Sequence, residues 1–292
     1  MVLYELIGQL RAEHSVEQLC GLLGVSRSAY YRYQRGATYQ PNPQQATTQS
    51  LVQAVFYQHK RRYGSRRIAA QLQQQGHPVG RRQVRSMMKQ ADLQAIQPRS
   101  FVPRTTDSRQ GHYWPNLLMD EPFPQAPNRV WVSDITYLPL VGGGWVYLAV
   151  WMDLYSRRVV GWRIEDHLGE ELVIGALQSA LQSRQPAAGL LAHSDRGGQY
   201  ISKLLKAVIH LWGIRPSMSR ADDPYDNAFA ESLWSRLKAE LLKDGAFLNL
   251  DEARSEVFAY LEGYYNRVRL HSSLGNQSPD TYERVYYQQF AS

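Results

Sequence analysis

The stretch RVWVSDITYLPL, residues 129–140, alternates apolar and polar side chains as a half-buried β-strand does. The next segment, GGWVYLAVWMDLYSRRVVGWRIED at 143–166, predicts two more strands with a turn near 155–157. Helical and short strand-like runs then alternate, at 170–183, 190–195, 199–212, 214–218 and 227–243. This order predicts an α/β fold, a mixed five-stranded sheet with flanking helices on both faces.

The residues before this segment predict helices only. SVEQLCGLLGVSRSAYYRYQRG at 15–36 has the helix, tight turn, helix order of a helix-turn-helix, with Ser15 and Ser26 as N-caps. We therefore expect a helix-turn-helix at 1–35. The same pattern recurs at 51–97, which predicts a second helix-turn-helix-like DNA-binding domain. A plain three-helix miniature domain is the alternative for the first unit, because the pattern is common.

Composition divides the rest of the chain. Residues 36–50 are polar and rich in Gln and Pro, and residues 98–128 hold six prolines; both stretches predict linkers, of which the second can lie along the next domain. A catalytic core is then expected at 129–245, with a C-terminal helical tail at 246–292.

The charge distribution indicates a polyanion as partner. The 292 residues carry a net charge of +7, but residues 1–110 hold 16 Lys and Arg against 5 Asp and Glu, and residues 111–292 hold 17 against 21. A single cysteine, Cys20, excludes an internal disulfide framework and a cysteine-cluster zinc site. The longest mainly apolar stretch is too short to span a bilayer and no secretory signal is evident, so we expect a cytoplasmic protein without a membrane partner.

Basic residues on the last helix of the second unit are candidate DNA contacts. Three of them are four residues apart and share one face of the helix. The candidates are Arg81, Arg82, Arg85 and Lys89. A solvated basic face is the alternative. A further cluster nearby favours nucleic acid: Lys60, Arg61, Arg62, Arg66 and Arg67.

Three acidic residues lie on or next to apolar runs: Asp134 in the first strand, Asp195 after LLAHS, and Glu231 on the last core helix. Converging buried carboxylates are costly unless a cation neutralises them. Oxygen ligands favour Mg²⁺, with Mn²⁺ as a substitute, and two such ions suit phosphoryl transfer. We predict that the three carboxylates are catalytic and hold two metal ions. His193, two residues before Asp195, either lines this site or is a core histidine.

Three motifs resemble those of a known family. WVSDITYLP (131–139), HSDRGGQY (193–200) and YDNAFAESLWSRLKAEL (225–241) are similar to the catalytic motifs of bacterial insertion-sequence transposases of the IS-three type, specifically the second-frame OrfB product. That group belongs to the DDE, or retroviral-integrase, superfamily. Its mark is two Asp and one Glu with 35 residues between the second and the third, as between Asp195 and Glu231.

The resemblance extends to basic and tail residues. Lys238 lies seven positions after the Glu, as in the family, and is expected to touch a DNA phosphate. The tail YYNRVRLHSSLGNQSPDTYE (264–283) is also similar, and it makes Arg269 and His271 candidate DNA contacts, with a structural salt bridge as the alternative. Arg196 either binds phosphate or braces its loop.

The resemblance implies an RNase H-like catalytic core and a DNA transposase. Such a transposase would bind the terminal inverted repeats of an insertion sequence, nick DNA and join the ends to target DNA, without a covalent protein–DNA intermediate. We expect a homo-oligomer, at least a dimer on DNA, associated with the nucleoid. A first-frame helix-turn-helix protein (OrfA) is an expected partner. The alternatives are a catalytically silent DNA-binding regulator and a general RNase H-like nuclease.

Overall fold

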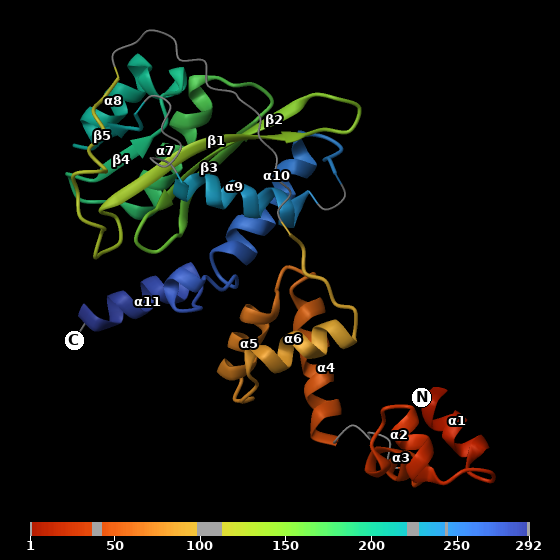
Figure 1. Cartoon of the computed structure of the whole chain (residues 1–292). Coiled ribbons are helices and arrows are strands. Elements are labelled where there is room, and N and C mark those ends of the chain that lie inside the picture. Colours follow the sequence, from red (N-terminus) through yellow and green to blue (C-terminus); the bar gives the residue numbers. More distant parts are fainter. Residues whose placement is uncertain (1, 37–42, 98–112, 221–227, 243–244, 291–292) are drawn as a thin grey trace.

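The computed structural model describes five stretches of the chain, residues 2–36, 43–97, 113–220, 228–242 and 245–290. Figure 1 shows two helical units, red and orange to gold, that precede a sheet covered by helices. None of the helices within these stretches combines the length and the apolar character needed to cross a membrane.

The first helical unit is α1 (Val2–Leu10), α2 (Val16–Leu22) and α3 (Arg27–Gln34). Both predicted N-caps are confirmed, because the side chains of Ser15 and Ser26 accept hydrogen bonds from backbone amides three residues ahead. The small core contains Ile7, Leu19, Cys20 and Tyr30.

The second helical unit is α4 (Pro43–Gln58), α5 (Ser65–Gln74) and α6 (Arg81–Gln90). The linker prediction for 36–50 is wrong over its second half, because α4 begins at Pro43. Proline is tolerated in a first helical turn and Gln and Ala form helices readily, yet this half lacks the apolar stripe that would reveal a helix. The side-chain amide of Gln49 donates to the carbonyl of Met87 and fixes α4 to α6.

The sheet has the strand order β3-β2-β1-β4-β5. Its strands are β1 (Val130–Pro139), β2 (Trp145–Asp153), β3 (Val159–Glu165), β4 (Leu191–Ser194) and β5 (Arg215–Met218). The meander β1–β3 is antiparallel, and β4 pairs in parallel with both β1 and β5. The predicted mixed five-stranded sheet is therefore confirmed.

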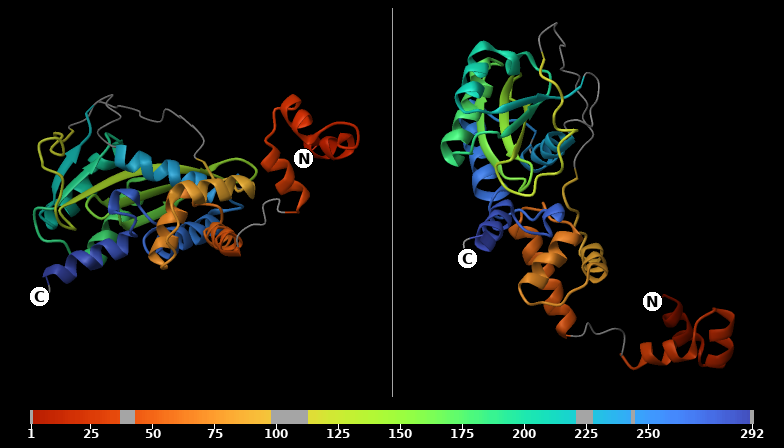
Figure 2. Two further views of the ribbon diagram at one scale, coloured as in Figure 1. Left: turned by 60° about the horizontal axis from the view of Figure 1, so that its bottom comes forward. Right: turned by 90° about the vertical axis from the view of Figure 1, so that its left-hand side faces the viewer.

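Helices cover both faces of this sheet (Figure 2, right). On one face, α7 (Glu170–Arg184) and α8 (Lys203–Leu211) pack over a cluster that includes Trp131 and Trp151. On the other, α9 (Ala228–Leu241) and α10 (Leu250–Phe258) pack over a cluster that includes Val130 and Val132. Successive β1 side chains thus alternate between two cores, so both faces of this strand are covered, whereas its sequence pattern predicts a half-buried strand.

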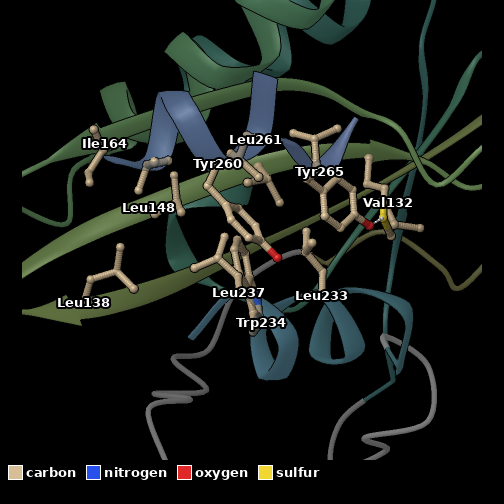
Figure 3. Packing of buried hydrophobic residues seen from close by; sticks show 14 of the residues in the cluster. Val132, Leu138, Leu148, Ile164, Leu233, Trp234, Leu237, Tyr260, Leu261 and Tyr265 are labelled. Atoms are coloured by element: carbon tan, nitrogen blue, oxygen red, sulfur yellow. Dashed lines mark hydrogen bonds between the residues drawn. The ribbon is translucent and has the colours of Figure 1, made fainter. Parts of the chain in front are cut away.

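The C-terminal segment is part of the second of these cores. It continues through the π-helix η3 (Ala259–Tyr265), the 3-10 helix η4 (Ser272–Leu274) and α11 (Pro279–Phe290). Figure 3 shows Tyr260, Leu261 and Tyr265 packed against Leu233 and Leu237 of α9 and against the strands. The expected division into a core at 129–245 and a separate tail at 246–292 is thereby corrected, since one hydrophobic cluster spans it. Leu237 and Tyr260 on the two sides of this boundary are 23 residues apart in sequence, beyond the range of any local pattern.

Residues 113–128, the described part of the second predicted linker, lie along the sheet domain as expected. The amide of Leu117 donates to the hydroxyl of Ser217, and the amide of Met218 donates to the carbonyl of Pro115. This segment therefore lies beside the carboxyl-terminal half of β5.

Candidate active site

Asp134 lies on β1, and Asp195 directly follows β4, the strand that pairs with β1 in parallel. The register pairs Val132 of β1 with His193 of β4, and each aspartate comes two residues later. Val132 and Leu191 belong to the cluster under α9, so strand alternation directs both aspartates towards the face that α9 covers. Two carboxylates from distant parts of the sequence therefore follow neighbouring strands on one face of the sheet.

The carboxylate of Asp134 is held at both oxygens. Oδ2 accepts a 2.8 Å hydrogen bond from the indole Nε1 of Trp234 on α9. Oδ1 accepts one of 2.8 Å from the amide of Ile135. The half-buried carboxylate therefore has a defined orientation and is bonded directly to α9, the helix that covers this face of the sheet.

Asp195 follows β4 and is held by its own loop. Its Oδ1 accepts a 3.0 Å hydrogen bond from the amide of Gly197. Burial raises the pKa of Asp195, and the Gly197 amide opposes that shift. Burial also raises the pKa of Tyr200, and the nearby charges of Asp195 and Asp134 raise it further. The charges of both carboxylates therefore act on the phenol of Tyr200, which agrees with their positions after neighbouring strands.

Glu231 is in the first half of α9, but its side chain lies outside the described residues. Its backbone position is three residues before Trp234, less than one helical turn. Farther along α9, the half-buried ammonium of Lys238 sits 4.4 Å from the ring centre of Tyr137. Burial lowers the pKa of Lys238, while the charge of Asp134 raises it. Trp234 and Lys238 therefore place one side of α9 beside Asp134.

His193 is a core histidine, which decides between its two predicted roles. It is fully buried, and its ring nitrogens are 2.9 Å and 3.2 Å from the hydroxyls of Ser217 and Ser219. Arg196 braces its loop: its Nε donates to the carbonyl of Ser219 and its guanidinium stacks on the ring of Tyr113.

Arg269 forms the structural salt bridge that was the alternative to a DNA contact, and the DNA contact predicted for His271 is corrected. Arg269 is only 2% exposed and forms an ion pair of 2.9 Å with Glu240. Burial first, and the charge of Arg269 second, lower the pKa of His271 to about 2, so this imidazole is neutral at physiological pH. Neither side chain offers a positive charge to a phosphate. The sequence motif contains Arg269 but not Glu240, the buried residue with which it pairs.

The basic face of α6 is exposed as predicted. Its exposed side chains are Arg81, Arg82, Arg85 and Lys89. Its other side supplies Val84, Met87 and Met88 to the core of the unit. The neighbouring basic cluster divides, because Arg61 and Arg66 are exposed whereas Arg62 and Arg67 are half-buried.

Two residues at the site were missed from the sequence. Trp234 had a signal, since it lies three residues after Glu231 on one helix, but an apolar stripe accounted for it equally well. Tyr200 lies within a recognised motif, and its hydroxyl is 2.8 Å from that of Ser133, beneath the two aspartates. One tyrosine among 19 carries no signal of its own.

The donor set suits a hard cation. Carboxylate oxygens, such as those of Asp134 and Asp195, are the ligands that Mg²⁺ and Mn²⁺ prefer. Burial raises the pKa of Asp195, so a bound cation would favour its ionised form. Among the described side chains, which exclude that of Glu231, no three His, Cys, Asp or Glu residues gather as a metal-binding group. Asp134 and Asp195 are the two predicted metal ligands whose side chains the structure describes.

Comparison with known proteins agrees with this architecture. The family described as integrase core domain matches residues 124–224, a second integrase core domain family matches 212–279, and an HTH-like domain matches 44–101. These matches and the observed sheet confirm the predicted RNase H-like fold class. They cover the described sheet, both aspartates and the second helical unit.

Individual relatives extend over nearly the whole chain. The "Insertion element IS600 uncharacterized 31 kDa protein" of Shigella sonnei is 38% identical over 94% of this chain and 100% of that protein. "Transposase InsF for insertion sequence IS3A" of Escherichia coli is 37% identical over 96% of this chain and 98% of that protein. The HTLV-2 integrase catalytic core domain, solved in complex with magnesium, is 18% identical, covers 55% of this chain and 98% of that chain, and has a TM-score of 0.41.

Proposed function

The chain belongs to the family of IS3-type insertion-sequence transposases and is a DDE transposase, a polynucleotidyl transferase; from this premise we propose that it binds the terminal inverted repeats of its own element, nicks the DNA beside them and joins the freed 3′ ends to a target. Two DNA ends must be held at once, so the proposal includes a homo-oligomer, at least a dimer on DNA. A first-frame OrfA partner would add a further DNA-binding unit.

Asp134, Asp195 and Glu231 are proposed as the catalytic metal ligands. Trp234 supports the assignment of Glu231, because a residue three positions away on α9 already contacts Asp134. Two Mg²⁺ ions, with Mn²⁺ as a substitute, would activate the attacking oxygen and stabilise the leaving 3′ oxygen when bound. The chain's own residues orient the carboxylates: Trp234 holds Asp134 and the Gly197 amide holds Asp195.

DNA binding is assigned to two surfaces. The exposed basic face of α6 supplies Arg81, Arg85 and Lys89 to phosphates of the terminal repeat. Lys238, held over the ring of Tyr137 beside Asp134, supplies a charge close to the scissile phosphate. The first surface would choose the site, and the second would position the reacting strand.

The observation that best supports this proposal is the parallel pairing of β1 with β4, because Asp134 lies two residues after Val132 and Asp195 two residues after its partner His193. The test is incubation of the full chain with Mg²⁺ and a duplex that bears the element's terminal repeat. We expect nicked and joined products from the wild type and from Asp166→Asn, which alters an exposed carboxyl outside the site. Asp195→Asn should give neither product. Repeat binding without any cutting by the wild type would instead indicate a silent regulator.

A further inference from the structure

The second helical unit is attached to the catalytic domain through a buried tyrosine. Tyr63 is fully buried, and its hydroxyl donates to the carbonyl of Val268 at 3.2 Å and accepts from the amide of Leu270 at 2.9 Å. The side chain of Leu270 enters the hydrophobic core of the helical unit. A segment of the C-terminal region thus binds this unit through both its backbone and its side chain.

Two arginines of the unit bind the same region. Arg67 Nε donates to the carbonyl of Leu270 at 2.9 Å. Arg62 donates to the backbone carbonyl of Glu240 at 3.3 Å, and its guanidinium lies 4.5 Å from the ring centre of Tyr264. Both arginines belong to the basic cluster expected to face DNA. Their donors point instead into the catalytic domain, whereas the neighbouring Arg66 stays exposed.

Glu240 connects these contacts to helix α9. It is a buried residue of α9, and its carboxylate accepts from Arg269 and from the hydroxyl of Tyr260. The same helix carries Trp234, six residues earlier, bound to Asp134. Helix α9 therefore contacts the candidate active site through the side chain of Trp234 and the helical unit through the backbone carbonyl of Glu240.

The position of α6 is fixed by its packing within the helical unit. Helices α4, α5 and α6 share one core, which contains Tyr63, Val84 and Met87. A packed core transmits displacement because its side chains leave little free volume. The exposed basic face of α6 is consequently held in one orientation relative to α9.

We propose that Tyr63, Arg62 and Arg67, with Val268, Leu270 and Glu240 opposite them, form an interface that determines where the enzyme cuts relative to the sequence it binds. These six residues are called the Tyr63 interface. The inference rests on the proposed function, in which α6 reads the terminal repeat. Adjacent base pairs are 3.4 Å apart along each strand of DNA, so a loosened interface that lets α6 shift by that distance moves the cut by one position. Tyr63, Arg62 and Arg67 are positioning residues in this account.

The test compares cut positions at nucleotide resolution on a duplex with the element end. The full chain is used as wild type, Tyr63→Phe and Arg62→Ala, with Tyr57→Phe and Arg254→Ala as matched controls at exposed positions outside the interface. In the two interface variants we expect the ratio of the main cut to cuts one or two positions away to fall about tenfold, the effect of losing roughly one or two hydrogen bonds. Both controls should keep the wild-type ratio. A merely structural role would lower the amount of cutting but leave the ratio unchanged, and that result would overturn the inference.

Amide hydrogen exchange at Leu270 gives a readout that needs no cutting. Tyr63→Phe removes the acceptor of that amide, so exchange at Leu270 should accelerate about tenfold while the thermal melt stays cooperative. Exchange at the wild-type rate in a folded Tyr63→Phe chain would refute the interface, whether or not the wild type cuts DNA. A wild type that binds the repeat but never cuts it would refute the proposed function separately.

Discussion

The indole Nε1 of Trp234 donates a 2.8 Å hydrogen bond to Oδ2 of Asp134, and this bond joins helix α9 to strand β1 at the candidate active site. Trp234 is buried in the cluster that α9 forms with the sheet, so its ring cannot rotate freely. The bond therefore orients a carboxylate proposed as a metal ligand, and it does so from the helix that carries Glu231.

Replacing the indole should weaken metal use without unfolding the chain. Trp234→Phe keeps an aromatic ring but removes the N–H, which as a hydrogen bond to a charged group contributes about 1.5–3 kcal/mol. We expect nicking at limiting Mg²⁺ to fall roughly 10- to 100-fold and the apparent Mg²⁺ affinity to fall with it. Trp162→Phe is the matched control, because Trp162 donates its Nε1 to Glu262 away from the site. Equal losses in both variants would contradict the role of Trp234.

Mg²⁺ should stabilise the folded chain through Asp195. Burial raises the pKa of Asp195, so its ionised form is unfavourable until a cation is bound. Thermal melts with and without Mg²⁺ should show a rise for the wild type and for Asp166→Asn, equivalent to about 1.4 kcal/mol at tenfold excess over the dissociation constant. Asp195→Asn should show no rise. The assignment fails if this variant gains as much from Mg²⁺ as the wild type.

His271 should make the chain sensitive to mild acid. Burial lowers its pKa from the ordinary 6.5 to about 2, so below pH 6.5 the unfolded chain binds a proton that the folded chain does not. The contribution of the neutral His271 to the free energy of unfolding is fully present above pH 6.5. It is lost as the pH falls towards 2, by about 1.4 kcal/mol per pH unit. Denaturant unfolding at pH 7.5, 6 and 5 should show a shallower loss in His271→Gln. His210→Gln, at an exposed position, should keep the wild-type slope; a wild-type slope in His271→Gln would refute the prediction.

Arg269 should matter for stability rather than for DNA binding. Arg269→Ala leaves the buried carboxylate of Glu240 without its guanidinium, which typically costs about 3–5 kcal/mol. Arg267→Ala, at a largely exposed position two residues away, should cost less than about 0.5 kcal/mol. Chemical denaturation measures both. A stable Arg269→Ala variant whose DNA affinity has become less dependent on salt would show instead that Arg269 contacts phosphate.

Local sequence patterns predicted most of the elements but failed where no periodic signal existed. The alternation along β1 and the caps at Ser15 and Ser26 were readable because each depends on neighbours within a few residues. The first half of α4 was missed because its Gln and Thr residues form no apolar stripe. Its attachment to α6 runs through one side-chain bond from Gln49, which no local pattern contains.

The same distinction applies to the charged residues. The sequence marked Asp134, Asp195 and a set of basic side chains as candidates, but it could not say which cation meets which carboxylate. For Arg269 the sequence left a DNA contact and a structural salt bridge open, because its motif did not include Glu240, 29 residues earlier. Arg62 and Arg67 belong to the basic cluster that favoured nucleic acid, but in the structure they donate to backbone carbonyls of Glu240 and Leu270 in the catalytic domain.

The amino-acid sequence alone thus determined the type and order of the helices and strands, the family and the candidate chemistry, since periodicity, capping and motif spacing are properties of the chain itself. Only the tertiary structure decided which polar groups share a buried space: Trp234 with Asp134, Tyr63 with Leu270, Arg269 with Glu240. These pairs depend on how separate elements pack. A buried donor or acceptor must find its partner wherever the fold places one, whatever its distance along the sequence.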